Sequence, residues 1–351
     1  MRNGGNAMVR SSFVLVSVLM LTPLSAWAQQ YVDTAGRLSV VIVADPYSDT
    51  RTGPELVEGP GLLLAGGLQG RLEEMGCDVA KVTTVQMPPE LEREYGEWNR
   101  ASLTNRTLGK TIYASDQGEH FFIGLLSGSK SLVGMLAGLQ HLGPDRQPLQ
   151  DSRGRDILGL PRLGESGPLK VGLVWVSARG DFNTPNTSME GDMGGMNVAV
   201  AAGLSNKMLR QQAGLDPSIP TKHIVMAGVQ NTNPYEQLSI DNSFIETVSV
   251  EEMRYSSSAI EAQMERLSGS TDVIYVHVDV NILSVAEMPD LPASPHDRLS
   301  SEELAAVLQK VFAFPKAAAI GIAGLPNDAD EISIQAAYGL IEGAIGGVRN
   351  R

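Results

Sequence analysis

The sequence predicts an α/β protein, a three-layer α/β/α sandwich around a mostly parallel sheet of about eight strands. One observation is that apolar runs alternate with amphipathic segments for most of the chain, as strands and helices alternate in such proteins. Another is that the apolar runs are rich in Val and Ile without polar alternation, the pattern of strands buried on both faces. Because the chain has 351 residues and no internal repeat, we expect a single domain over residues 29–351.

The individual elements follow from these patterns. Six apolar runs predict the inner strands, at residues 37–44, 120–126, 169–176, 222–229, 272–280 and 317–324. Two less apolar runs, 78–85 and 245–250, are weaker candidates for edge strands. Amphipathic segments predict helices at 61–75, 130–141, 193–204, 257–267, 301–312 and 331–345, and residues 87–118 read as a polar helical excursion. The charged, Gly/Pro-rich segment 143–168 is expected to be a long exposed connection.

The first residues have the pattern of a secretory signal peptide. Arg2 and Arg10 precede the apolar run FVLVSVLMLTPL, and the AWA sequence at 26–28 supplies a small-x-small cleavage site. The apolar run is shorter than the roughly 20 residues that a membrane-spanning helix needs. We therefore expect residues 1–28 to be removed, leaving a secreted or periplasmic protein without a membrane anchor.

Composition restricts the classes of partner and site. Removal of the signal peptide takes away two arginines and no acidic residue, so the formal net charge of −13 becomes more negative still. A strongly acidic surface disfavours nucleic acid as a partner. Cys77 is the only cysteine of the chain, which excludes an intrachain disulfide and a thiolate metal cluster.

Polar side chains gather where predicted strands end, which is where ligands bind in a parallel sheet. The stretch WVSARGDFNTP, residues 175–185, runs from a buried strand into a turn that carries Arg179 and Asp181. In HVDVN, residues 277–281, the two-residue period of a strand places His277, Asp279 and Asn281 on one face. Such a row fits a metal or polar site, and it equally fits a buried hydrogen-bonded network.

These strand ends, together with ELVEGP at residues 55–60, resemble the ureohydrolase superfamily, the arginase and agmatinase group. The segment 55–60 matches an early Gly-Val-Glu-x-Gly-Pro segment of that family, and the resemblance covers nearly all of the chain after the signal peptide. It implies an eight-stranded parallel sheet, two Mn(II) ions, and hydrolysis of a guanidinium group to urea and an amine. It also implies a homo-oligomer, a trimer or a hexamer.

The first two metal-binding motifs of the family are only partly present. The motif Gly-Gly-Asp-His-Ser aligns with LSGSK, where Ser129 stands in place of a histidine ligand. The motif Asp-Ala-His-x-Asp-x-Asn-Thr-Pro aligns with SARGDFNTP. There Ser177 and Arg179 replace an aspartate and a histidine, while Asp181 and the Asn-Thr-Pro sequence are kept.

The remaining catalytic positions are altered as well. The third motif, Asp-x-Asp, retains Asp279 but has Asn281 in place of its second aspartate. Gly194 stands where the resemblance implies an imidazole proton shuttle, and the predicted strand 317–324 has no carboxylate to hold a guanidinium. The resemblance therefore assigns no catalytic residue that this chain still has.

Charge argues against two metal ions at these positions. Asp181, Asp279 and Arg179 together carry a net charge of about −1, which leaves two divalent cations uncompensated in a poorly solvated site. Ser and Asn are weak ligands that do not offset the dehydration of a metal ion. We therefore predict that the dinuclear centre is absent, that no cofactor is bound, and that Arg179 bridges the two aspartates by charge-assisted hydrogen bonds.

The favoured function is that of a pseudoenzyme, which binds a small polar or guanidino ligand or has a role in assembly. The residues expected to line the ligand site are Asn183, Glu190, Asp192, Asn233 and Glu236. The alternative is a divergent arginase- or agmatinase-type hydrolase of guanidino C–N bonds with a reduced metal site. In that case one divalent metal such as Mn(II) would be held by His277, Asp279, Asn281 and Asp181.

Overall fold

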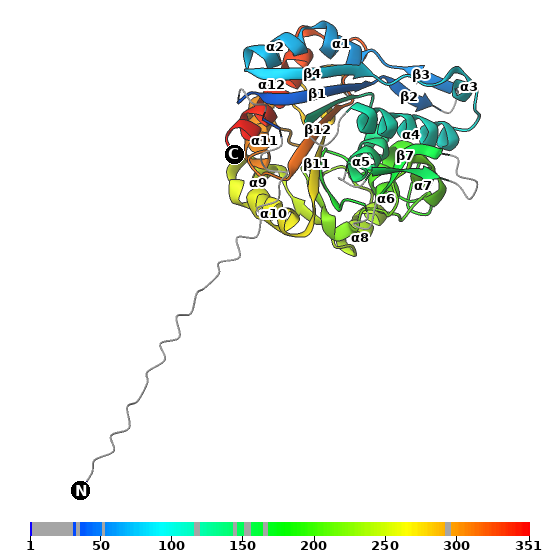
Figure 1. Cartoon of the computed structure of the whole chain (residues 1–351). Coiled ribbons are helices and arrows are strands. Elements are labelled where there is room, and N and C mark those ends of the chain that lie inside the picture. The colour runs from blue at the N-terminus through cyan, green and yellow to red at the C-terminus, as the bar shows by residue number, and fades with distance from the viewer. Residues whose placement is uncertain are drawn as a thin grey trace.

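The structure is a computed structural model that describes residues 1, 31–32, 36–50, 53–115, 120–142, 146–150, 156–163, 168–291 and 296–351 (Figure 1). The predicted signal peptide, residues 1–28, lies outside the described residues except for its first residue. Within the described part of the chain, no helix is both long and apolar enough to cross a membrane.

A parallel sheet of eight strands forms the centre of the protein, in the order β10-β9-β8-β11-β12-β5-β1-β4. Every neighbouring pair in it is parallel. Its strands are β1 (Leu38–Asp45), β4 (Cys77–Thr84), β5 (Phe121–Leu126), β8 (Val171–Val176), β9 (Ile224–Ala227), β10 (Glu246–Val248), β11 (Val273–Asp279) and β12 (Ala317–Ala323).

The predicted strands and the fold class are confirmed. Each of the eight candidate runs overlaps one strand of the sheet, and the two weaker candidates correspond to β4 and β10, the two edge strands. The difference in sequence has a physical cause, because an inner strand is covered on both faces and an edge strand is not. Every residue of the inner strand β1 is buried, whereas most residues of β4 are partly or fully exposed.

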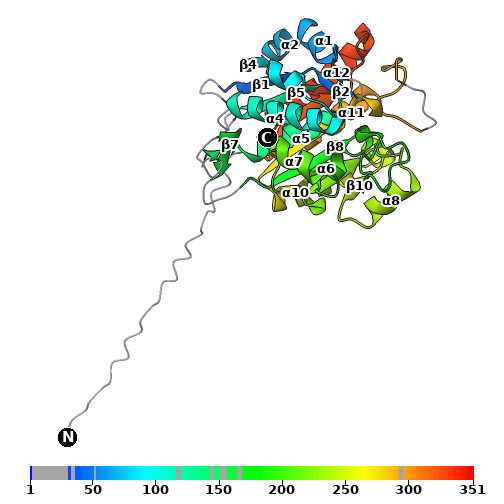
Figure 2. The same ribbon diagram turned by 90° about the vertical axis from the view of Figure 1, so that its right-hand side faces the viewer.

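Helices cover both faces of the sheet and complete the three predicted layers (Figures 1 and 2). One layer contains α1 (Gly59–Ala65), α2 (Leu68–Glu74), α9 (Val250–Tyr255), α10 (Ser257–Ser270), α11 (Ser301–Val311) and α12 (Glu331–Arg349). The other contains α4 (Glu97–Ser115), α5 (Leu132–Gln140), α6 (Asn197–Ala201) and α7 (Lys207–Ala213). Two further helices are the short α3 (Pro89–Glu92) and α8 (Pro234–Asp241).

Two expectations about connecting segments are wrong. The single helix predicted over 61–75 is two helices, because Gly67 between them adopts a left-handed φ of 94° that ends the helical path. The segment 143–168 was expected to be a long exposed connection, but it contains two strands, β6 (Arg146–Gln150) and β7 (Asp156–Leu163), which pair as an antiparallel hairpin. An isolated two-stranded ladder accepts proline, since each of its strands has an outer edge that needs no partner. A second such hairpin joins β2 (Tyr47–Thr50) to β3 (Gly53–Leu56).

Candidate functional site

The polar positions identified in the sequence converge at the carboxyl ends of neighbouring strands. Ser177 follows β8, Asp279 ends β11, and Ser129 follows β5. In the sheet, β8 is next to β11, and β12 separates β11 from β5. All the positions that the resemblance assigns to metal ligands therefore lie along one edge of the sheet, where a parallel sheet places its ligands.

Hydrogen bonds join the turn after β8 to the turn after β11. The Oδ1 of Asn281 accepts a hydrogen bond from Ser177 Oγ at 3.1 Å and from Ala178 N at 2.8 Å. The backbone N–H of Asn281 donates to Asp279 Oδ1 at 3.0 Å. The expectation that Asn281 shares a strand face with Asp279 is wrong, because β11 ends at Asp279 and Asn281 lies in the 3₁₀ turn η5 (Val280–Ile282). Two replaced ligand positions thus bond to each other.

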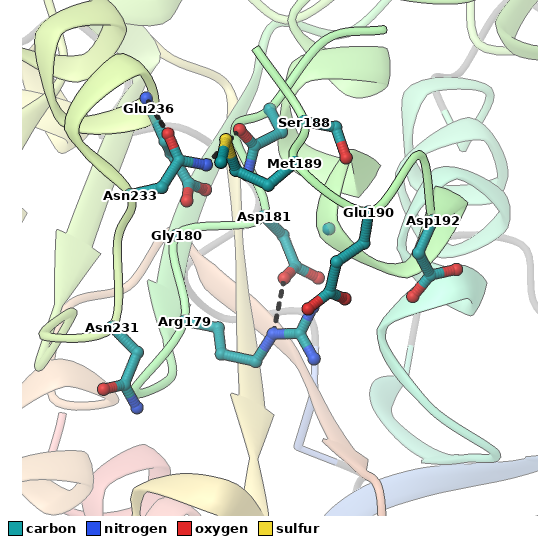
Figure 3. Close-up of a pocket in the computed structure, with 12 residues that line it drawn as sticks. Arg179, Gly180, Asp181, Ser188, Met189, Glu190, Asp192, Asn231, Asn233 and Glu236 are labelled. Atoms are coloured by element: carbon teal, nitrogen blue, oxygen red, sulfur yellow. Dashed lines mark hydrogen bonds and ion pairs between the residues drawn. The ribbon is translucent and has the colours of Figure 1, made fainter.

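Arg179 forms an ion pair with Asp181 at the centre of the site (Figure 3). Its Nε lies 3.4 Å from Asp181 Oδ1, and the two side chains are 52% and 2% exposed. The backbone carbonyl of Arg179 accepts a hydrogen bond from Trp175 Nε1 at 2.7 Å, which fixes the turn. In the part of the chain that the structure describes, Arg179 does not form the predicted bridge to Asp279. Its Nε faces Asp181, and Asp279 Oδ1 accepts the backbone N–H of Asn281 instead.

Asp181 is held by a residue that the sequence did not indicate. Asn197, the first residue of α6, donates its Nδ2 hydrogens to Asp181 Oδ2 at 3.1 Å, to Ser129 Oγ at 3.2 Å and to Gly194 O at 2.9 Å. Asp181 Oδ1 accepts no hydrogen bond from a residue that the structure describes, and the backbone of Asp181 adopts a left-handed φ of 46°. A lone asparagine at the start of an apolar helix has no signature in a single sequence, so only the fold identifies it.

Burial makes both retained carboxyl groups weaker acids. It raises the pKa of Asp181, while the Arg179 guanidinium and the hydrogen bond from Asn197 act in the opposite direction. Burial also raises the pKa of Asp279 to about 7, against the hydrogen bond from the Asn281 N–H. The pKa of Arg179 is raised, first by Asp181. The site therefore carries less negative charge than two ordinary carboxylates would give it.

His277 is buried inside the sheet, below the site, where it packs against aromatic side chains. Its ring stacks on Trp175 of β8 with centroids 4.5 Å apart and planes at 10°, and its Nδ1 lies 3.0 Å from the hydroxyl of Tyr275. Burial lowers the pKa of His277 to about 3, so the ring is neutral. Glycine at position 321 makes room for this cluster, because a Cβ there would lie 2.1 Å from the Tyr275 hydroxyl. His277 Nε2 makes no hydrogen bond within the described part of the chain.

A pocket of about 370 Å³ opens beside Arg179 and Asp181 (Figure 3). The structure brings together around it all five residues that the sequence predicted to line a ligand site: Asn183, Glu190, Asp192, Asn233 and Glu236. Ser188, Met189 and Asn231 also line the pocket and were missed, because their side chains form no motif. That these residues bind a ligand stays a prediction.

One wall of the pocket is held in place by hydrogen bonds. Asn233 Oδ1 caps α8 by accepting two N–H groups of its first turn, and its Nδ2 donates to Asn183 Oδ1 at 2.9 Å. Glu236 Oε1 accepts the backbone N–H of Phe182 at 2.8 Å. Glu236 is almost fully buried, and this burial raises the pKa of its carboxyl group. The wall is therefore preorganised.

The opposite side of the pocket is formed by the segment around Gly194. This residue belongs to the 3₁₀ turn η3 (Met193–Gly195), and its N–H donates to Asp192 Oδ1 at 3.0 Å. Among the described residues, no group of three or more His, Cys, Asp or Glu side chains is arranged to hold a metal ion. The side chains that could serve as metal ligands at the site are two carboxylates beside a guanidinium, together with Ser and Asn groups that already form hydrogen bonds with one another.

Comparisons with known proteins agree with this fold. The Arginase family model matches residues 162–341. The arginase of Bacillus caldovelox is 24% identical over 262 residues, which cover 72% of this chain and 78% of that protein. The structure of Entamoeba histolytica arginase in complex with L-ornithine superimposes with a TM-score of 0.69 at 21% identity, over 88% of this chain and 98% of that chain. Formimidoylglutamase from Bacillus subtilis gives a TM-score of 0.60 at 13% identity, over 99% of this chain and 96% of that chain.

The family match covers the motif at residues 177–185 and confirms the resemblance, and this chain belongs to the arginase family.

Proposed function

We propose that this protein is an exported member of the arginase family that has lost the dinuclear manganese centre and guanidinium hydrolysis, and that its pocket serves binding. The observation that carries the proposal is the ion pair of Arg179 with Asp181. A guanidinium at this position places a fixed positive charge where the resemblance implies a histidine ligand and two cations. The buried Asp181 thus has a counter-charge supplied by the chain itself.

The donor set does not fit two divalent ions. Asn281 Oδ1 already accepts hydrogen bonds from Ser177 and Ala178, so it has no lone pair directed at a metal ion without breaking them. Neutral Ser and Asn oxygens balance no charge, and Arg179 adds one of the same sign as the ions. These contacts support the loss of the centre and of the hydrolysis that depends on it.

Export is supported by the amino-terminal sequence alone. The order of Arg2 and Arg10, an apolar run and a small-x-small site is typical of a cleaved leader. Amino-terminal sequencing of the protein recovered from the periplasm or medium tests it, with Gln29 expected as the first residue. Recovery of the uncleaved chain in the cytoplasm would contradict export.

Metal content and turnover test the proposal directly. The mature protein, purified after incubation with Mn(II), is assayed for bound metal and for urea released from arginine and agmatine. We expect neither stoichiometric Mn(II) nor urea. A matched variant carries Ser129→His, Ser177→Asp, Arg179→His and Asn281→Asp, which restores the ligand types that the family motifs have. Mn(II) binding by this variant and not by the wild type is the expected result, whereas metal and turnover in the wild type would overturn the proposal.

A second candidate function is hydrolysis of guanidino or related C–N bonds at an altered site with one metal ion. The observation that favours it is Asp181 Oδ1, a buried carboxylate oxygen that is ion-paired with Arg179 but accepts no hydrogen bond in the described part of the chain. The names of the relatives, arginase and formimidoylglutamase, agree with C–N hydrolysis as the ancestral chemistry. One equivalent of metal together with turnover in the assay above would select this candidate.

A further inference from the structure

A second cavity, of about 610 Å³, lies at the edge of the sheet where the strands begin. It is lined by the side chains of Tyr31, Val32, Leu38 and Val348 and by two cations, Arg349 and Arg351. Leu38 is the first residue of β1, and Arg349 is the last residue of α12. Because all eight strands are parallel, this edge is opposite the one that carries Arg179 and Asp181. The cavity, here called the Tyr31 cavity, is therefore separate from the candidate site described above.

The apolar wall of the Tyr31 cavity is held by contacts within the fold. The ring of Tyr31 packs edge-on against Phe121 with centroids 6.2 Å apart, and its carbonyl accepts the N–H of Ser39 at 2.6 Å. Val32 forms an antiparallel bridge with Leu38, yet its side chain is 54% exposed. An apolar side chain that the backbone holds in place and leaves open offers contact area to a ligand without a further ordering cost.

Arg351 brings a positive charge to this cavity without a carboxylate that balances it. Its guanidinium donates to three backbone carbonyls, those of Phe312 and Pro315 at 2.9 and 3.2 Å and that of Ala317. These bonds fix the C-terminal end of the chain beside α11, where Figure 1 marks it. The Cζ of Arg351 lies 5.9 Å from the centroid of the Tyr31 ring. Carbonyl dipoles carry only partial charges, so the guanidinium keeps a net positive charge at the cavity.

Arg349 is the cation of the cavity that remains available. Over the described ranges of the chain, its side chain forms no hydrogen bond and no ion pair. Its two Nη atoms lie 3.4 and 3.5 Å from the place that a Cβ on Gly76 would take, so the guanidinium lies against the turn before β4. By contrast, Arg37 at the same edge lies 3.8 Å from Asp78. A guanidinium binds a phosphate or a carboxylate through two parallel hydrogen bonds, and Arg349 has both Nη groups available for them.

The local charge of the Tyr31 cavity runs against that of the whole chain. The protein carries a formal net charge of −13, yet two guanidinium groups meet at this cavity and neither is paired with a carboxylate that the structure describes. An arginine at the end of a helix also stabilises the helix dipole, which accounts for a cation at position 349. It does not account for an apolar cavity beside that cation. Apolar walls with a few convergent charged groups are typical of small-molecule sites.

We propose that the Tyr31 cavity binds an anionic amphiphile. Its phosphate or carboxylate head pairs with Arg349, next to the charge of Arg351. Its apolar chain packs on Tyr31 and Val32. This chemistry is shared by the head group and acyl chain of an anionic lipid and by a free alkyl phosphate or fatty acid. The site goes beyond the proposed function and does not depend on it, because its residues lie at the other edge of the sheet.

Isothermal titration calorimetry of the full mature protein tests the site with three probes. They are octyl phosphate below its micellar concentration, inorganic phosphate, and octyl glucoside as the neutral amphiphile. Octyl phosphate is expected to bind about tenfold more tightly than inorganic phosphate, because its chain is removed from water. Octyl glucoside is expected to show no measurable binding.

Variants assign the two parts of the probe to the two parts of the cavity. Arg349→Gln is expected to weaken octyl phosphate about tenfold. Arg349→Lys keeps the charge but lacks the planar fork, so it should weaken binding only about threefold. Val32→Ser should weaken octyl phosphate about threefold and leave inorganic phosphate unchanged.

A matched control separates the cavity from general electrostatics. Lys207→Gln removes one exposed cation from α7, in the other helix layer, and is expected to bind octyl phosphate as the wild type does. Without ligand, the Tm of Arg349→Gln should lie within about 2 °C of the wild type, because the side chain makes no hydrogen bond to lose. Equal affinity of the wild type and Arg349→Gln, or the same loss in Lys207→Gln, overturns the site. Equal affinity for octyl phosphate and inorganic phosphate overturns the amphiphile.

Vesicles distinguish the two sources of the anion. The wild type and Arg349→Gln are sedimented with vesicles of phosphatidylcholine alone and with vesicles that contain phosphatidylglycerol in equal amount. Binding of the wild type to the anionic vesicles, lost in Arg349→Gln, assigns a lipid head group. Binding of octyl phosphate without binding to vesicles assigns a free amphiphile. Absence of both overturns the proposal, whatever the metal content of the sample.

Discussion

Replacement of Arg179 by methionine is the most direct perturbation of the site. Methionine keeps much of the aliphatic stem and removes the charge, so Asp181, which is 2% exposed, loses its counter-charge. Breaking a fully buried ion pair costs about 3–5 kcal/mol, and an exposed pair contributes about 0.2–1 kcal/mol. Because Arg179 is 52% exposed, solvent screens its half of the pair. We therefore expect Arg179→Met to lower the free energy of unfolding by about 1–2 kcal/mol.

Thermal unfolding of the mature protein measures this change. For a chain of this size, 1–2 kcal/mol corresponds to a fall in Tm of about 2–3 °C. The matched control is Arg37→Met, because Arg37 lies 3.8 Å from Asp78 with both side chains exposed, at 55% and 42%. That substitution is expected to change stability by less than about 0.5 kcal/mol.

A double-mutant cycle and a pH series isolate the charge. Adding Asp181→Asn to Arg179→Met removes the unpaired carboxylate, so it should return part of the lost stability. The loss in the single variant should also shrink as the pH falls, because a protonated Asp181 needs no counter-charge. An unchanged Tm, or a loss equal to that of Arg37→Met, would refute the electrostatic role of Arg179.

Further predictions concern the surroundings of the pair. Burial raises the pKa of Asp279 to about 7, above its usual 3.8, so folding favours the protonated carboxyl group. The free energy of unfolding should therefore fall as pH rises from about 4 to 7. Urea unfolding measured across this pH range should show a flatter slope for Asp279→Asn than for the wild type. Asn281→Ala removes the acceptor of Ser177 Oγ and should cost about 1–3 kcal/mol, whereas a neutral result in denaturant unfolding would show that water replaces it. Gly321→Ala places a Cβ against the Tyr275 hydroxyl and should cost about 1–3 kcal/mol by overpacking, with partial recovery on adding Tyr275→Phe.

The sheet could be predicted from the sequence because burial on both faces of its inner strands leaves a continuous apolar signature. Even the ranking of candidates carried information, since the less apolar runs 78–85 and 245–250 became edge strands. The hairpin of β6 and β7 could not be predicted, because its pairing is antiparallel and its sequence has the composition of a loop.

The site was predictable in its membership and less so in its contacts. The strand-end rule brought Ser129, Ser177 and Asp279 to one edge, and motif alignment identified Arg179. Which carboxylate Arg179 pairs with depends on the conformation of its side chain, which no pattern of residue types encodes. The role of Asn197 could not be predicted for a related reason, because its three hydrogen-bond acceptors come from segments that are distant in sequence or lie in turns.

The ring stack under the site gives the protein a spectroscopic reporter. Trp175 is fully buried on a neutral imidazole, and its indole N–H bonds to the carbonyl of Arg179, so its emission senses the conformation of that turn. Beyond the predicted leader the only other tryptophan is Trp98, which Trp98→Phe removes. Because His277 does not acquire a proton above about pH 3, the indole keeps one neighbour across the physiological range. Binding of a ligand in the pocket can then be followed by the intrinsic fluorescence of Trp175, without a label.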